Sequence, residues 1–171
     1  MFLSKLHEIT TFVFDVDGVL TDGSVFVTDS GDKFRQFNIK DGYALQLAVK
    51  CGYKVAAISG AVAESTRIRL NDLGVKDVFM ASKDKVATLK NYLEHMGIDA
   101  STAVFMGDDI PDMKVMQYCG LPVCPADAVE EIKAISTYIS PIPGGKGCAR
   151  DIIEKVMKVQ GKWLNAEAYS W

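Results

Sequence analysis

The stretch FVFDVDGVLTDG, Phe12 to Gly23, decides the fold class of this 171-residue chain. Its apolar start is typical of a buried β-strand, and the strand leads into two carboxylates on alternate residues, Asp15 and Asp17, followed by Gly18. Side chains two residues apart in a strand point to the same side. Two acids at the carboxyl end of a buried strand indicate a ligand site, because open α/β sheets bind ligands beyond that edge.

Apolar runs of strand length alternate with stretches of helical period along the rest of the chain. This order predicts an α/β fold with a Rossmann-like parallel sheet, helices on both faces, and a single domain spanning residues 1–171. Near-continuous hydrophobicity is what strands covered on both faces require. The predicted strands are 9–16, 53–59, 77–80, 102–107 and 120–125, and the predicted helices are 41–51, 63–73, 83–96, 111–118, 126–134 and 148–159.

The segment Ser24–Ile39 breaks this order. It reads as two short strands around Asp29-Ser30-Gly31-Asp32, which predicts a β-hairpin inserted after the first strand. Its apolar side chains leave neither face suited to water, so we expect the hairpin to pack against another subunit.

Composition and charge narrow the function classes. The chain has 19 basic and 22 acidic residues and a net charge of -3, without a basic tract, which argues against a nucleic-acid partner. A polar N-terminus and the lack of an apolar run of about 20 residues predict a cytoplasmic protein without a membrane partner. The four cysteines are scattered and are expected to be reduced, and His7 and His95 have no ligand neighbours at useful spacing.

Several groups are predicted to converge at one edge of the sheet. Ser59 ends the second strand, Asp108 and Asp109 follow the fourth, and Lys85 begins a helix after the third. Crowded carboxylates repel one another unless they are protonated, paired or bound to a cation. Oxygen ligands without His or Cys favour a hard cation, and a site with room for waters and a phosphate oxygen suits Mg²⁺.

The same residues carry a resemblance to a known family. The order DxDGVLTDG at Asp15–Gly23, ISG at Ile58–Gly60, Lys85 and GDDxxD at Gly107–Asp112 resembles the haloacid dehalogenase superfamily of phosphatases. The longer runs DGVLTDG, FNIKDGYALQL and GGKGCARDIIEKV are similar to its 3-deoxy-D-manno-octulosonate 8-phosphate phosphatases, over about the whole chain.

The resemblance implies a role for each residue. Asp15 is the expected nucleophile that forms an aspartyl phosphate, and Asp17 the acid that protonates the leaving sugar oxygen and then the base that activates water. Ser59 and Lys85 would hold the phosphoryl oxygens. The expected Mg²⁺ ligands are Asp15, the main-chain carbonyl of Asp17, and Asp108, with Asp109 and Asp112 supporting them. Taken singly, such motifs are more often caps or turns; their order across several strand ends is what indicates catalysis.

Substrate selection is expected to depend on other segments. The intervals between the motifs are too short for a cap domain, and the resemblance implies a homotetramer in which a neighbour's C-terminal segment, around Gly144 to Arg150 and beyond, covers the site. It also places Asn38, Ile39, Lys40, Asp41, Gly42 and Arg69 on a phosphorylated sugar acid, together with Lys85. A solvated helix face is an equal alternative for Arg69, and a flexible turn is the simpler interpretation of Gly144–Gly147.

One departure from the family pattern affects the substrate. The family commonly reads Ser-Gly-Arg after the second strand, whereas this chain has Ser59-Gly60-Ala61. The branch that acts on 2-keto-3-deoxynononate 9-phosphate has glutamate at the position of Ala61, so the chain matches neither pattern. The eight-carbon substrate is preferred; the nine-carbon analogue, phosphotransfer as in a mutase, and a non-catalytic regulatory or assembly module remain as alternatives.

Overall fold

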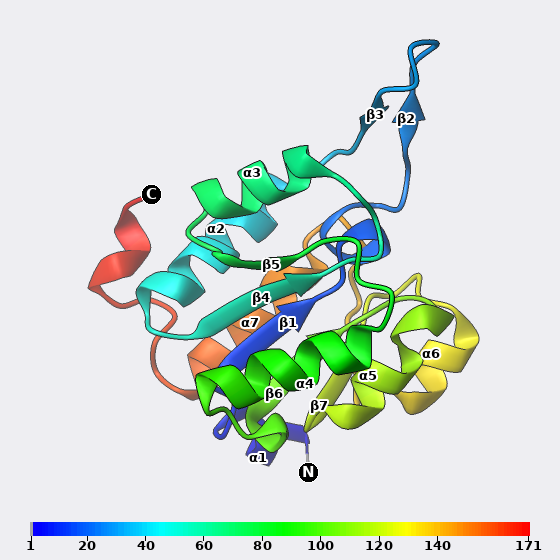
Figure 1. Ribbon diagram of the computed structural model, residues 1–171. Coiled ribbons are helices and arrows are strands. Elements are labelled where there is room, and N and C mark those ends of the chain that lie inside the picture. The colour runs from blue at the N-terminus through cyan, green and yellow to red at the C-terminus, as the bar shows by residue number, and fades with distance from the viewer. Residues whose placement is uncertain (1) are drawn as a thin grey trace.

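Six parallel strands form the central sheet in the order β5-β4-β1-β6-β7-β8 (Figure 1). The structure is a computed structural model and describes residues 2–171. Strand β1, the first strand of the chain, lies inside the sheet between β4 and β6, which come from later parts of the chain. The strands are β1 Thr11–Phe14, β4 Lys54–Ile58, β5 Asp77–Phe79, β6 Ala103–Met106, β7 Leu121–Cys124 and β8 Tyr138–Ile139.

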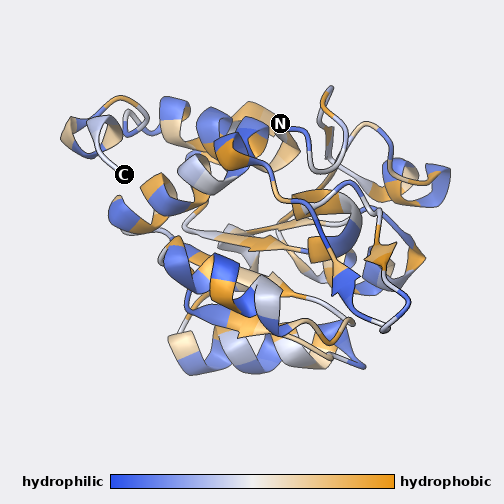
Figure 2. Ribbon diagram, turned by 90° about the horizontal axis from the view of Figure 1, so that it is seen from above, coloured by the Kyte–Doolittle hydropathy of each residue, from blue (hydrophilic) through white to orange (hydrophobic). Residues whose placement is uncertain are grey.

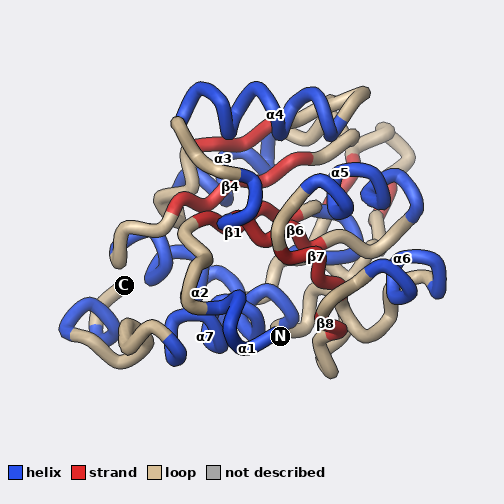
Figure 3. Tube along the Cα trace, turned by 90° about the horizontal axis from the view of Figure 1, so that it is seen from below, coloured by secondary structure: helices blue, strands red, loops and turns tan. Residues whose placement is uncertain are grey.

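Helices cover both faces of this sheet, as predicted (Figure 3). In β1, Phe12 and Phe14 pack with the core that includes α2 and α7, while Val13 packs with the core that includes α4 and α5. Strand side chains alternate between the faces, so a strand covered on both is apolar at every position. The helices are α1 Phe2–Leu6, α2 Ile39–Lys50, α3 Glu64–Asp72, α4 Lys85–Met96, α5 Met113–Tyr118, α6 Glu130–Ile135 and α7 Cys148–Val159.

Hydropathy follows these layers. The central strands are largely in the hydrophobic colours, whereas the surrounding helices carry both colours (Figure 2).

Side-chain caps fix where two of the helices begin: Asn38 accepts hydrogen bonds from the backbone of Lys40 and Asp41 at the start of α2, and Asp84 accepts one from Ala87 at the start of α4. The cap at Asp84 therefore places Lys85 as the first residue of its helix.

The structure differs from the sequence-based elements in several places, among them the N-terminal helix α1, which was not predicted. A sixth strand, β8, extends the sheet beyond β7, and its two residues gave too short a pattern to be predicted. The helix expected at 126–134 begins only at Glu130, because Asp127 turns toward the later loop and accepts a hydrogen bond from Gly144. β1 ends at Phe14, so Asp15 and Asp17 belong to the turn after the strand.

The predicted hairpin is present and projects away from the body of the molecule (Figure 1). Its strands β2 (Phe26–Val27) and β3 (Lys33–Phe34) pair antiparallel, with Phe26 opposite Phe34. All four of these residues are exposed. A hairpin of this size cannot form a hydrophobic core on its own, so its apolar side chains remain in solvent within one chain.

The C-terminal residues pack against α2. Residues Ala166–Tyr169 form a short 3-10 turn, and the Tyr43 hydroxyl donates a 2.6 Å hydrogen bond to the carbonyl of Ala168. All four cysteines are free. Within residues 2–171, no helix has the length and hydrophobicity needed to cross a membrane.

Candidate active site

An open cavity of about 360 Å³ lies beyond the carboxyl ends of β1, β4 and β6. It brings together side chains that are far apart in the sequence, as the positions of the strand ends predicted. The lining residues are Asp15, Asp17, Gly23, Ser59, Gly60, Ala61, Lys85, Asp108, Asp109, Pro111 and Asp112. All the residues predicted to be catalytic, metal-binding or supporting are among them.

Lys85 is held between two carboxylates at the floor of this cavity. Its Nζ donates hydrogen bonds of 2.8 Å to Asp15 Oδ1 and 2.6 Å to Asp112 Oδ1. The Lys85 and Asp15 side chains are about one tenth exposed, and that of Asp112 is almost fully buried. An ammonium in this position screens two acids that would otherwise repel each other, and it binds only one of the two carboxyl oxygens of Asp15.

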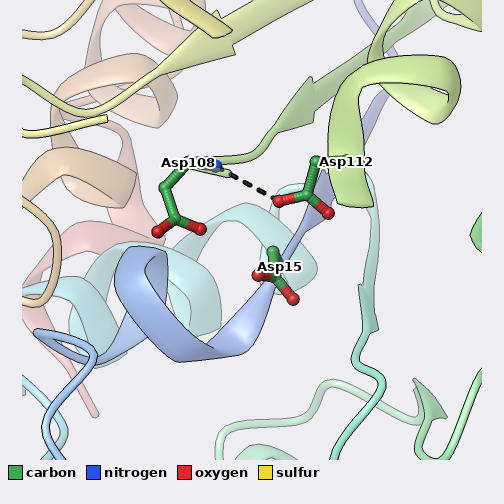
Figure 4. A group of neighbouring side chains, drawn as sticks. All are labelled: Asp15, Asp108 and Asp112. Carbon is green, nitrogen blue, oxygen red and sulfur yellow. Dashed lines mark hydrogen bonds between the residues drawn. The ribbon is translucent and has the colours of Figure 1, made fainter. Parts of the chain in front are cut away.

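Three carboxylates from two turns face one another: Asp15, Asp108 and Asp112 (Figure 4). One oxygen from each lies within 4.8 Å of the others, a spacing that can hold a metal ion. Asp112 Oδ2 also accepts a hydrogen bond from the backbone of Asp108 at 3.2 Å, which ties the two residues together. Hard divalent cations take oxygen ligands of this kind, so the group fits Mg²⁺ better than a softer metal.

Two further observations support a cation at this group. Asp108 Oδ1 is buried without a hydrogen-bond partner, which is costly unless something else binds it. Gly18 has a φ of +92°, and a Cβ at this position would collide with the Asp108 carboxylate. The glycine after Asp17 is therefore required both for the turn and for the room that Asp108 occupies.

Burial and mutual repulsion raise the pKa values of two acids in this group. Burial, followed by the charge of Asp112, raises the pKa of Asp15 to about 6. Burial, followed by the charges of Asp15 and Asp112, raises the pKa of Asp108 to about 7. Burial lowers the pKa of Lys85, but the two adjacent acids outweigh it and the net pKa is raised, so the ammonium stays charged. A bound cation would favour the ionised form of both carboxylates.

Asp17 also lines the cavity but does not belong to the group of three facing carboxylates. Its side chain forms a two-point ion pair with Arg35: Nε donates to Oδ1 at 2.7 Å and Nη2 donates to Oδ2 at 3.0 Å. The resemblance assigned only the main-chain carbonyl of Asp17 to the metal, and that role stays a prediction. Sequence reasoning missed Arg35; its signal was a lone arginine in a hairpin strand, in the run Phe34-Arg35-Gln36-Phe37.

Ser59 and Ala61 form the wall contributed by the end of β4. Ser59 Oγ accepts a 3.1 Å hydrogen bond from the backbone of Ala61, which leaves the hydroxyl proton free for another acceptor. The small Ala61 side chain adds no charge to this wall. Among the cavity-lining residues, Lys85 is the only cation.

The residues expected to select the substrate lie around the start of α2, outside this cavity. Ile39 and Lys40 are exposed, and Asn38 caps the helix. Asp41 is buried, and its Oδ1 accepts a 2.8 Å hydrogen bond from the backbone of Arg150 at the start of α7. A Cβ on Gly42 would lie 2.8 Å from an Arg69 Nη atom, so the arginine lies over the glycine. None of these residues lines the cavity that contains Asp15, and their role in substrate binding stays a prediction.

The loop Gly144–Gly147 supports the turn that follows β1. The backbone of Gly145 donates a 2.8 Å hydrogen bond to Val19, and a Cβ on Gly144 would collide with the carbonyl of Gly18. These glycines permit a close backbone approach, and the loop does not line the cavity. This contact, instead of the flexible turn expected from the sequence, is what the loop provides within the chain.

Comparison with known proteins decides the family. The profile of the haloacid dehalogenase-like hydrolases matches residues 50–150, more than half of the chain. This chain is a haloacid dehalogenase-like hydrolase. The hydrolase is also 31% identical, over 98% of its length and 89% of the relative, to the 3-deoxy-D-manno-octulosonate 8-phosphate phosphatase KdsC of Escherichia coli K12.

Solved structures agree with this assignment. The hydrolase superposes with a TM-score of 0.91 on the 3-deoxy-D-manno-octulosonate 8-phosphate phosphatase from Yersinia pestis, at 29% identity and covering 94% and 86% of the two chains. The corresponding enzyme from Moraxella catarrhalis, solved with magnesium, phosphate and the sugar acid KDO, gives a TM-score of 0.90 at 30% identity, covering 93% and 91%. The resemblance found from the motifs is therefore confirmed at the level of sequence family and fold.

Proposed function

We propose that this protein is a Mg²⁺-dependent phosphatase that hydrolyses 3-deoxy-D-manno-octulosonate 8-phosphate to the free sugar acid and phosphate. The observation that carries this proposal is the Lys85 ammonium between Asp15 and Asp112, with Asp108 facing the same point. This arrangement offers a nucleophile, a fixed cation for phosphoryl oxygens and an oxygen-ligand metal site in one cavity. The relatives named above act on that sugar phosphate, and one of them binds magnesium.

In the first half-reaction, the Asp15 carboxyl oxygen that Lys85 does not bind attacks phosphorus and the bond from phosphorus to the sugar oxygen breaks. The departing oxygen takes the electron pair of that bond and a proton from Asp17. Lys85 and the Ser59 hydroxyl hold phosphoryl oxygens during the transfer. Mg²⁺ held by Asp15, Asp108 and the Asp17 carbonyl, with Asp109 and Asp112 in support, would neutralise phosphoryl charge.

In the second half-reaction, water attacks the phosphorus of the aspartyl phosphate. Asp17, now ionised, takes a proton from this water, and phosphate leaves as the Asp15 carboxylate is regenerated. Each step is mostly positioning and charge neutralisation, which a rigid strand end and a helix start provide.

Substrate selection and assembly form a second part of the proposal. The cavity is open and Lys85 is its only lining cation, so the carboxylate of a sugar acid requires a further basic group. We assign this group to a second copy within a cytoplasmic homotetramer whose hairpins associate, presenting Asn38–Gly42 or Arg69 to a neighbour's cavity. Four exposed apolar residues on the hairpin, Val25, Phe26, Val27 and Phe34, support such a contact.

The nine-carbon analogue, 2-keto-3-deoxynononate 9-phosphate, is the second candidate substrate. Ala61 leaves this substrate open, because the wall beside Ser59 carries neither the arginine that the eight-carbon enzymes commonly have nor the glutamate of the nine-carbon branch. A non-catalytic module of the same fold has no use for the Asp15–Lys85 pair, which makes that alternative weaker.

The test is phosphate release from the two sugar phosphates by the purified protein with Mg²⁺, compared with the variant Asp15→Asn. We expect release from the eight-carbon phosphate by the wild type and loss of at least 10³-fold in the variant, on the order found for removal of a nucleophile. A much higher kcat/KM for the nine-carbon phosphate would reassign the substrate, and equal activity of the two proteins would remove the catalytic assignment.

A further inference from the structure

Arg35 is the one residue between Asp22 and Gln36 that turns inward. Every other residue from Asp22 to Gln36 is exposed, including four large apolar ones. The Arg35 side chain is only 8% exposed. Burying an arginine in place of an apolar residue is costly unless the guanidinium is paired, so its partner explains its position.

That partner is Asp17, and the contact is a bidentate ion pair between the guanidinium and the carboxylate. Nε and Nη2 each donate to a different carboxylate oxygen, at 2.7 and 3.0 Å. Paired parallel hydrogen bonds fix the plane and the direction of a carboxylate, which one ammonium cannot do. Asp17 also accepts a weak hydrogen bond from the Thr21 hydroxyl, which lies 3.5 Å from Asp17 Oδ1.

Without Arg35, nothing strong would fix the Asp17 side chain. It is 31% exposed at the cavity mouth and is followed by Gly18 in a left-handed conformation, where the backbone adds no steric restraint. Asp15 differs in this respect, because Lys85 already orients it. The two catalytic acids are therefore oriented by cations from different parts of the chain, one from α4 and one from the hairpin.

We propose that Arg35 is a positioning residue for Asp17 and makes proton transfer to the leaving group depend on the placement of the hairpin. The proposal rests on the function proposed above. When the bond between phosphorus and the sugar oxygen breaks, that oxygen takes the bond's electron pair and a proton from Asp17. For this step Asp17 carries the proton on one carboxyl oxygen while the other oxygen keeps its hydrogen bond from Arg35, so the distance and angle of Asp17 set the efficiency of the transfer. Arg35 follows β3 directly, so a displaced hairpin displaces the group that orients Asp17.

The test compares two leaving groups in the variants Arg35→Met and Arg35→Lys. An unactivated sugar alkoxide needs a proton as it departs, whereas p-nitrophenolate leaves as a stable anion. For Arg35→Met we expect kcat/KM to fall by about 10²-fold with the sugar phosphate and by less than about 3-fold with p-nitrophenyl phosphate. Arg35→Lys keeps the charge but loses the fork, so it should recover only part of the loss.

The matched control is Lys33→Met, which removes an exposed cation two residues away on the same hairpin strand. It should leave both kcat/KM values at the wild-type level. Equal losses on the two substrates in Arg35→Met would show a general structural effect and overturn the proposal. An increase with the sugar phosphate would also overturn it, because the ion pair would then hold Asp17 away from the reaction.

Two further measurements distinguish a folding defect in the variants from a failure of the phosphatase function proposed above. Thermal melting and Mg²⁺ titration of each variant show whether the fold and the site are intact. If Arg35→Met does not fold, the test uses Arg35→Lys and Arg35→Gln, again comparing kcat/KM for the sugar phosphate with kcat/KM for p-nitrophenyl phosphate. Failure of the proposed function gives no Mg²⁺-dependent phosphate release by the wild type from either substrate. Failure of the Arg35 proposal gives an active wild type whose leaving-group ratio does not change in the variants.

Discussion

Lys85 Nζ lies 2.8 Å from Asp15 Oδ1, joining the first residue of α4 to the end of β1 across 70 positions of sequence. The same ammonium reaches Asp112 Oδ1 at 2.6 Å. One buried cation thus orients the proposed nucleophile and offsets the charge of a second acid. The chemistry assigned to this protein depends on that contact more than on any other.

Replacing Lys85 with Met should abolish most of the activity. Asp15 and Asp112 would face each other without a cation, which raises the pKa of Asp15 further, and the phosphoryl oxygens would lose a charged donor. We expect kcat to fall by about 10²- to 10³-fold, as for loss of a preorganised donor. The control is Lys83→Met, which removes an exposed lysine just before the same helix and should retain wild-type turnover.

The metal-free protein should become less stable as pH rises from about 4 to about 7. Asp15 and Asp108 have folded-state pKa values of about 6 and about 7, above the usual 3.8, so the folded state keeps protons that the unfolded state has released. The stability they contribute is complete below the unfolded pKa and is lost as pH passes through the folded one. Urea unfolding in the presence of a chelator, repeated across this pH range, measures the slope.

Asp108→Asn provides the matched variant for that experiment. It removes the group with the larger shift, so the pH slope should flatten and the metal-free variant should be more stable than the wild type near neutral pH, by roughly 1–3 kcal/mol. Catalysis and Mg²⁺ affinity should both fall in the variant. An unchanged slope would mean that Asp108 does not carry the raised pKa.

Gly18→Ala tests the space that Asp108 occupies. The new methyl group would displace the Asp108 carboxylate, and the backbone φ of +92° is strained for alanine. Gly52→Ala is the matched control, because its φ of +87° gives similar strain while a Cβ there meets nothing within 4 Å. Both variants should lose about 1 kcal/mol of stability, but only Gly18→Ala should weaken Mg²⁺ binding in calorimetric titration.

Asp41→Ala distinguishes a structural role from a direct role in substrate binding. Asp41 accepts the backbone N–H of Arg150 at the start of α7, so its loss should lower the free energy of unfolding by about 1 kcal/mol, the usual cost of a lost cap. Because the side chain is buried between α2 and α7, KM should stay near the wild-type value. A rise in KM at unchanged stability would instead support the substrate contact that the resemblance implies.

The hairpin predictions concern assembly. Phe26→Ser and Phe34→Ser replace side chains that are 66% and 57% exposed and lie opposite each other. We expect the double variant to shift the sedimentation coefficient from that of a tetramer to that of a smaller species. Leu164→Ser removes an equally exposed apolar side chain elsewhere and should leave the assembly intact; a wild type that sediments as a monomer would contradict the tetramer itself.

The strand segments, their parallel arrangement and the edge that carries the candidate site could be predicted from the sequence because they depend on short-range signals. The order of the strands across the sheet could not, because it is set by long-range pairing. Continuous apolar runs gave the buried strands, and the acids at their ends gave the site, since parallel strands all end at one edge. The exact end of β1 and the two-residue strand β8 could not be predicted. The end of β1 depends on its pairing with β4 and β6, which are both distant in the sequence, and a two-residue strand such as β8 has no period of its own.

The sequence by itself determined the family, the set of candidate site residues and their approximate place, because each lies next to a strand or helix whose pattern is local. Tertiary structure alone decided which charges pair. Lys85 lies between Asp15 and Asp112, and Arg35, from the hairpin, pairs with Asp17. Asp41, which was expected to contact the substrate, instead accepts a hydrogen bond from the backbone of Arg150 at the start of α7. The physical reason is that ion pairing is set by distance and burial in the folded chain, and neither is encoded in the spacing of residues along it.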